Sequence, residues 1–69
     1  MIELSDAERA VEATLFAAAE PMSAADIALY VGDSVDVKAA LTTLAGHYAG
    51  RGVELVERGG RWHFQTAAD

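Results

Sequence analysis

Two histidines and a pair of glutamates are the side chains with which this sequence could do catalytic or metal chemistry. His47 and His63 are the only histidines, and no acidic residue stands at helical ligand spacing from His47. Glu8 and Glu12 share a predicted helix face, as paired catalytic carboxylates do, but such pairs are typical of the surface of an acidic protein. We interpret both histidines as solvated surface residues and expect neither catalysis nor a metal site.

Glycine-rich loops would offer a different chemistry, the binding of phosphate groups. Four of the six glycines, Gly50, Gly52, Gly59 and Gly60, follow a predicted helix or fill a predicted turn. A phosphate loop needs its glycines between a strand and the start of a helix. The chain also has no cysteine and hence no thiolate zinc site. We therefore expect no cofactor.

Three arginines, Arg51, Arg58 and Arg61, are the side chains that could contact a nucleic-acid backbone. Residues 1–50 carry only two basic side chains against eight acidic ones, and the net charge of the chain is −6. Binding by phosphate neutralisation needs clustered Lys and Arg. We expect no specific DNA binding; the alternative is a DNA-binding transcription regulator that makes weak phosphate contacts through these arginines.

The length of the chain limits what can position these side chains. Its 69 residues hold one small domain, 52% of whose residues are hydrophobic. A core of this size is marginal, so self-association would help to stabilise it. No apolar run is long enough to span a bilayer, and the N-terminus lacks the basic start and apolar core of a signal peptide. We expect a cytoplasmic protein without membrane contact.

Two capping patterns predict the first two helices. Ser5 with Glu8 begins a helix that runs to about Ala19. Pro21 makes residues 20–22 a connector. Ser23 with Asp26 then begins a short helix that ends at Gly32. The residues predicted to face the core are Leu4, Ala7, Val11, Leu15 and Ala18 in the first helix and Ile27, Tyr30 and Val31 in the second.

A third helix and a hairpin complete the domain. Asp33-Ser34 caps a helix that stops at Gly50, and its inward residues are Val37, Ala40, Leu41, Leu44 and Tyr48. Residues 53–58 and 61–66 alternate with a period near two around Gly59-Gly60, which predicts a β-hairpin. Its register places Val53, Leu55, Trp62 and Phe64 toward the helices and Val56 and His63 on the opposite face.

The predicted fold class is mainly α with a C-terminal β-hairpin (α+β). Three helices followed by a two-stranded wing make a winged helix-turn-helix domain over residues 1–66, and residues 67–69 form a tail or the start of a linker. Helix-turn-helix motifs commonly lay the second helix of the pair in the major groove. Of the side chains that read bases, the outer face of the third helix offers only Lys38, beside Val35 and small residues. Ala39, Thr43 and Gly46 on that face instead permit close approach of a partner chain.

Two apolar residues lie where the predicted core does not use them. Phe16 is about 140° from the Val11 direction around the first helix at ~100° per residue, beside Ala13 and Ala17. Val56 points opposite to Leu55 on the hairpin. Exposed apolar residues beside a marginal core favour association. We predict that Phe16 and Val56 lie in a homodimer contact.

The ordered set of motifs resembles the family of segregation and condensation protein B. The resemblance is carried by Val11-Glu12-Ala13-Thr14-Leu15-Phe16, by Glu20-Pro21-Met22-Ser23, and by the passage from Gly50-Arg51-Gly52-Val53-Glu54-Leu55-Val56-Glu57 to Gly59-Gly60-Arg61-Trp62-His63-Phe64-Gln65-Thr66. It covers nearly the whole chain.

The resemblance implies a non-enzymatic subunit of the bacterial complex that condenses and segregates chromosomes. Members of that family have two winged-helix domains, of which the first forms homodimers and corresponds to this chain. They also pair with the kleisin subunit, segregation and condensation protein A, which bridges the heads of the structural-maintenance-of-chromosomes (SMC) ATPase. The implied location is the cytoplasm, at the nucleoid through the complex.

Overall fold

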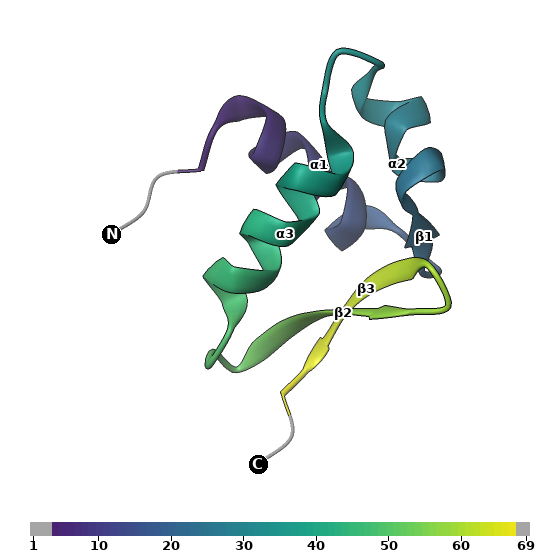
Figure 1. The fold of residues 1–69 in the computed structure, drawn as a ribbon. Coiled ribbons are helices and arrows are strands. Elements are labelled where there is room, and N and C mark those ends of the chain that lie inside the picture. Colours follow the sequence, from purple (N-terminus) through teal and green to yellow (C-terminus); the bar gives the residue numbers. More distant parts are fainter. Residues whose placement is uncertain (1–3, 68–69) are drawn as a thin grey trace.

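The computed structural model describes residues 4–67 and contains three helices and three strands in the order α1-β1-α2-α3-β2-β3. The helices are α1 (Asp6–Ala17), α2 (Ala24–Val31) and α3 (Val37–Tyr48), and the strands are β1 (Met22–Ser23), β2 (Val53–Arg58) and β3 (Arg61–Thr66). The β2–β3 hairpin lies across one end of the helical layer (Figure 1). The predicted fold class, a winged helix-turn-helix, is confirmed.

The starts of α1 and α2 are fixed by the two predicted capping boxes. The Ser5 hydroxyl accepts from the backbone N–H of Glu8 at 3.1 Å, and the Glu8 carboxylate accepts from the Ser5 N–H at 2.9 Å. Ser23 and Asp26 repeat this exchange at 3.0 and 3.4 Å. These bonds satisfy amide groups that the first turn of a helix leaves free. Helix α1 ends at Ala17, before the predicted Ala19, since Ala18 is already extended.

The start of α3 differs from the prediction. Its N-cap is Asp36, whose carboxylate accepts from the Ala39 N–H at 3.1 Å, and not Asp33-Ser34. Val35 therefore precedes the helix, and the prediction that it lies on the outer face of that helix is wrong. Its side chain packs against the core.

The predicted hairpin register is confirmed. Leu55 pairs with Phe64 and Val56 with His63, and the turn uses positive φ angles of 60° at Gly59 and 83° at Gly60.

The segment predicted as a connector contributes one further strand, β1, in which Met22 pairs with Trp62. The sheet thus has three strands in the order β1-β3-β2. Strand β1 ties the start of α2 to the wing.

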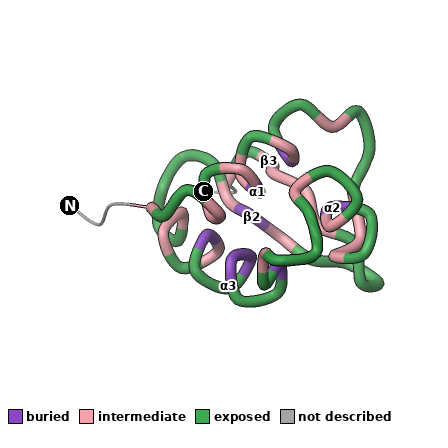
Figure 2. The backbone as a smooth tube through the Cα atoms, turned by 90° about the horizontal axis from the view of Figure 1, so that it is seen from above, coloured by how far each residue is buried: buried purple, intermediate pink, exposed green. Residues whose placement is uncertain are grey.

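The core is an aliphatic cluster between the helices and the hairpin. Figure 2 shows its buried positions on the inner sides of α2, α3 and β2. The buried residues are Val11, Leu15, Ile27, Val37, Ala40, Leu41, Leu44 and Leu55. Trp62 and Phe64 pack on this cluster and are partly buried. Among residues 4–67, no helix is long and apolar enough to cross a membrane.

Two residues predicted to face the core are exposed. Tyr30 is 76% exposed, because Ala24, Ile27, Ala28 and Val31 occupy the arc of α2 that faces the core. These four residues fill the core-facing side of a helix of 8 residues, so Tyr30 cannot reach the core. Val53 lies on the predicted hairpin face but is 37% exposed, since it begins the edge strand next to the turn that follows α3.

Candidate interaction surfaces

An aromatic cluster joins α1, α3 and β3 on the surface of the domain. The ring of Phe16 stacks on that of Phe64, with centroids 4.1 Å apart and planes 6° from parallel. Tyr48 meets both rings edge-on, at 6.3 Å from Phe16 and 5.0 Å from Phe64. Phe16 is nevertheless 56% exposed. One face of the Phe16 ring thus belongs to its own domain, and the rest of the side chain is open to a partner.

Tyr48 is held in this cluster by a side chain far away in sequence. Its hydroxyl donates a hydrogen bond to the Glu12 carboxylate on α1, 36 residues earlier. This hydrogen bond raises the pKa of Tyr48 above its ordinary value, and partial burial adds to the rise. The bond therefore links the last turn of α3 to the middle of α1, beside Phe16.

The structure does not bring Val56 together with Phe16. Phe16 stacks on Phe64, which shares the helix-facing side of the hairpin with Leu55. Val56 is paired with His63 and points to the opposite side, because neighbouring residues of a strand alternate between faces. Val56 is half-buried. A single flat contact therefore does not cover both predicted dimer residues.

The predicted partner-facing residues form a continuous stripe on α3. Ala39, Thr43 and Gly46 follow one another at helical spacing, and all three are exposed. No Cβ projects from Gly46, and a Cβ placed there would meet no atom within 4 Å. The stripe is a shallow face with small side chains, suited to close approach of a second backbone.

The three arginines lie at two separate ends of the hairpin. Arg58 and Arg61 face each other beside the turn, whereas Arg51 precedes the far end of β2 and donates from Nε to the His47 carbonyl at 3.1 Å. At ~3.3 Å per residue, the strand puts about 20 Å between these ends. All three side chains are exposed, but they do not converge on one phosphate.

The histidines are not the solvated residues that the sequence predicted. His47 is half-buried, with its ring edge-on to Tyr48 at 5.3 Å. His63 is also half-buried, and its Nδ1 atom is enclosed without a hydrogen-bond partner within the described part of the chain. The two glutamates are used locally, Glu8 in a capping box and Glu12 by Tyr48. Within residues 4–67, no three His, Asp or Glu side chains gather as metal ligands would.

Sequence reasoning missed a groove between α1 and α2. It has a volume of about 970 Å³ and is lined by Ala13, Thr14, Ala17, Ala18, Ala19, Glu20, Pro21, Met22, Asp26, Leu29, Tyr30 and Arg61. Leu29 and Tyr30 stand at its rim, 85% and 76% exposed. The available signal was the alanine run 17–19, which leaves room, followed by two consecutive large apolar residues on a short helix.

The chain is similar in sequence and in fold to proteins of one known family. The family described as segregation and condensation complex subunit ScpB matches residues 9–69. The crystal structure of ScpB from Mycobacterium tuberculosis superposes with a TM-score of 0.81 and 26% identity over 97% of this chain and 45% of that one. No curated protein sequence matches significantly.

A second solved structure covers the same region. The crystal structure of a dimer of the ScpB N-terminal domain complexed with a ScpA peptide superposes with a TM-score of 0.75 and 33% identity. The match covers 94% of this chain and 82% of that one. The chain therefore spans less than half of the mycobacterial protein and most of the isolated domain.

Proposed function

The chain belongs to the ScpB family of segregation and condensation complex subunits, and on that premise we propose that it is a homodimerisation and kleisin-interaction module. The membership confirms the family resemblance seen in the sequence. The proposed partners are a second copy, the kleisin ScpA and, through the kleisin, the SMC ATPase. We further propose that the chain is not an enzyme and acts in the cytoplasm, at the nucleoid.

One observation carries this proposal. The related N-terminal domain, 33% identical over 94% of this chain, is a dimer complexed with a ScpA peptide. In that relative, one domain makes both the dimer and the complex with the ScpA peptide, and this chain matches 82% of that domain. We propose that residues 1–66 are the first domain of a two-domain protein, since the chain matches an isolated N-terminal domain and covers 45% of the mycobacterial chain.

The self-contact is proposed at Phe16, with Val56 in a subsidiary role. Phe16 presents an aromatic surface that its own core does not cover, and aromatic side chains are common anchors of interfaces. Val56 lies on the other side of the hairpin, so that we assign it a smaller share of the contact. The α3 stripe of Ala39, Thr43 and Gly46 is the surface that admits close approach of a partner backbone.

The alternative of a DNA-binding regulator has weaker support. Among base-reading side chains, the outer face of α3 carries only Lys38 beside small residues, and the three arginines lie at two ends of the hairpin. Light scattering and a salt-titrated DNA-binding assay separate the two functions. We expect a dimer without salt-sensitive DNA binding. A monomer that binds duplex DNA, and loses that binding when Arg58 and Arg61 are replaced together, would overturn the proposal.

A further inference from the structure

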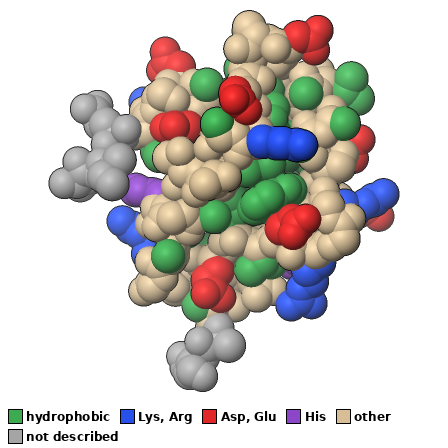
Figure 3. All heavy atoms as spheres, in the orientation of Figure 1, with side chains coloured by type: hydrophobic (Ala, Val, Ile, Leu, Met, Phe, Trp, Pro, Cys, Tyr) green, Lys and Arg blue, Asp and Glu red, His purple; other side chains and the backbone are tan. Residues whose placement is uncertain are grey.

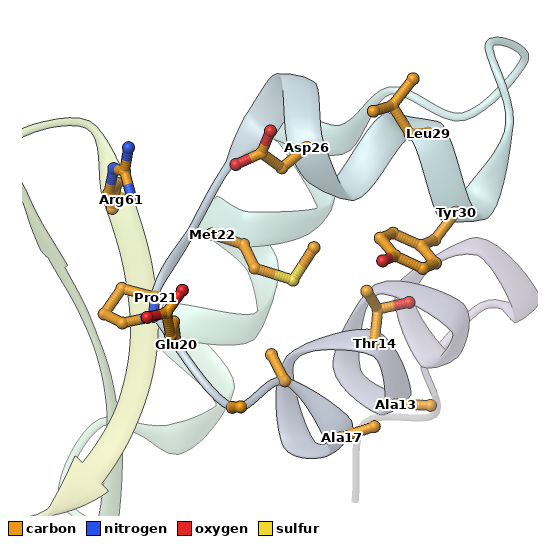
Figure 4. A pocket seen from close by; sticks show the side chains of 12 residues that line it. Ala13, Thr14, Ala17, Glu20, Pro21, Met22, Asp26, Leu29, Tyr30 and Arg61 are labelled. Carbon is orange, nitrogen blue, oxygen red and sulfur yellow. The ribbon is translucent and has the colours of Figure 1, made fainter.

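The groove between α1 and α2 is an apolar site that the domain does not fill itself. One wall is made of alanines from the end of α1, and Tyr30 on α2 points toward them, with Leu29 at the outer rim (Figure 4). Figure 4 shows Thr14, Met22 and Tyr30 projecting into the space between the helices. At about 970 Å³, the volume is near the top of the ~300–1,000 Å³ range of ligand sites.

Leu29 and Tyr30 cannot be explained as core residues. The core-facing arc of α2 is occupied by Ile27, Ala28 and Val31, so that two adjacent large apolar side chains are left in solvent. A single exposed leucine needs no explanation, but a pair on the rim of an apolar groove indicates an interaction site. Covering both side chains with a partner segment would remove their apolar surface from water, which favours binding.

The charges at the groove select among partners. Glu20 lies at one end of the groove and Asp26 on the first turn of α2, while Arg61 is the one basic side chain among the lining residues (Figure 4). The domain as a whole carries a net charge of −6. Acidic groups around an apolar groove favour a partner segment with apolar anchors flanked by Lys or Arg. A second copy of this chain would instead bring its own excess of acidic groups.

We infer that this groove receives an apolar segment of the kleisin, flanked by basic residues, with Leu29 and Tyr30 closing over its anchor side chains. The inference rests on the proposed function, from which the kleisin partner comes. An apolar groove between two helices suits a peptide segment. Ala13 and Ala17 lie about 60° and 100° around α1 from Phe16, at ~100° per residue. The kleisin would thus lie beside the proposed dimer contact without occupying it.

The test is calorimetric titration of the 69-residue chain and its variants with the kleisin from the same genome. Ala17→Tyr fills the groove and Leu29→Ser removes an apolar rim, and neither residue belongs to the core. We expect each variant to weaken kleisin binding by about tenfold or more, with unchanged helicity and a dimeric mass. Glu20→Lys should weaken binding and reduce its dependence on salt.

The matched control is Ala49→Tyr, the same substitution at the exposed alanine that caps the C-terminal end of α3, which belongs neither to the groove nor to the stripe. We expect it to leave kleisin affinity within about twofold. If Ala39→Tyr on the α3 stripe weakens binding and Ala17→Tyr does not, the stripe is the kleisin surface and the inference is wrong. Loss of the dimer in Ala17→Tyr or Leu29→Ser would assign the groove to a second copy and also overturn it. A wild-type dimer that fails to bind the kleisin would contradict the proposed function itself.

Discussion

The core and the α1–α2 groove are built from the same kinds of residue but differ in what covers them. Leu41 and Leu44 on α3 are fully buried between α1 and the hairpin, whereas Leu29 on α2 is 85% exposed. Figure 3 shows hydrophobic side chains gathered near the middle of one face with charged side chains around them. This small domain thus buries one set of apolar residues for its own stability and leaves a second set exposed.

The largest effect is expected in the core. Leu44 has no exposed surface, and truncation to alanine would remove buried methyl groups and leave a cavity. We expect Leu44→Ala to lower the free energy of unfolding by about 2–5 kcal/mol, as measured by chemical denaturation followed by circular dichroism. An unchanged free energy of unfolding would mean that the wrong face of α3 has been placed in the core.

A smaller effect is expected at the start of α2, which carries the groove. Ser23 caps this helix and belongs to β1, so that its hydroxyl fixes the orientation of α2 relative to the wing. We expect Ser23→Ala to cost about 1 kcal/mol of stability. The exposed Ser34, which caps no helix, supplies the control Ser34→Ala. Equal losses in both variants would contradict the assigned role of the cap.

The hydrogen bond between Tyr48 and Glu12 predicts a dependence on pH. The pKa of Tyr48 is raised in the folded state. The protonated hydroxyl therefore contributes fully to the stability of the fold below the ordinary tyrosine pKa, and this contribution is lost as pH rises through the pKa of the folded state. At neutral pH, Tyr48→Phe should cost about 0.5–1.5 kcal/mol. The difference from wild type should shrink above about pH 10. If the difference in the free energy of unfolding stays constant from pH 7 to 11, ionisation of Tyr48 does not affect the stability of the fold.

The smallest effect on stability is expected at the groove. Leu29→Ser should change the free energy of unfolding by less than about 0.5 kcal/mol, since the side chain is 85% exposed. Denaturation of Leu29→Ser alongside Leu44→Ala measures the contrast between the two regions directly. A loss for Leu29→Ser comparable to that for Leu44→Ala would place Leu29 in the core.

Local chemistry made most of the fold predictable. The capping boxes at Ser5 and Ser23 and the turn at Gly59-Gly60 depend on neighbouring residues only, and the long apolar stripe of α3 defined its buried face. The exposure of Tyr30 was not predictable in this way, because a helix of 8 residues gives periodicity too few turns to define one face.

The features that escaped prediction are those that join distant segments. Strand β1 has two residues and exists through its pairing with β3, nearly forty residues later. The bond between Tyr48 and Glu12 and the stack of Phe16 on Phe64 likewise depend on how α1, α3 and the hairpin pack. The groove arises from α1, β1, α2 and β3 together, so that no single stretch of sequence encodes it.

The stack of Phe16 on Phe64 also changes how the dimer contact must be tested. Replacing Phe16 removes an intramolecular aromatic pair worth about 0.5–1.5 kcal/mol as well as any contact with a partner. Stability and mass therefore have to be measured on the same samples. Val56→Asp, on the opposite face of the hairpin, should weaken the dimer less than Phe16→Asp, and equal weakening would give Val56 an equal share of the contact.

The most direct test of the division between core and partner surfaces is the solution mass of Phe16→Asp. Light scattering with circular dichroism should find wild type at twice the monomer mass of 7.3 kDa. Phe16→Asp should be a folded monomer with unchanged helicity, because a charge at this 56% exposed position can reach water in the monomer but is desolvated across the proposed contact. A variant that remains dimeric, or one that loses its helicity, would show that Phe16 serves another surface or the core.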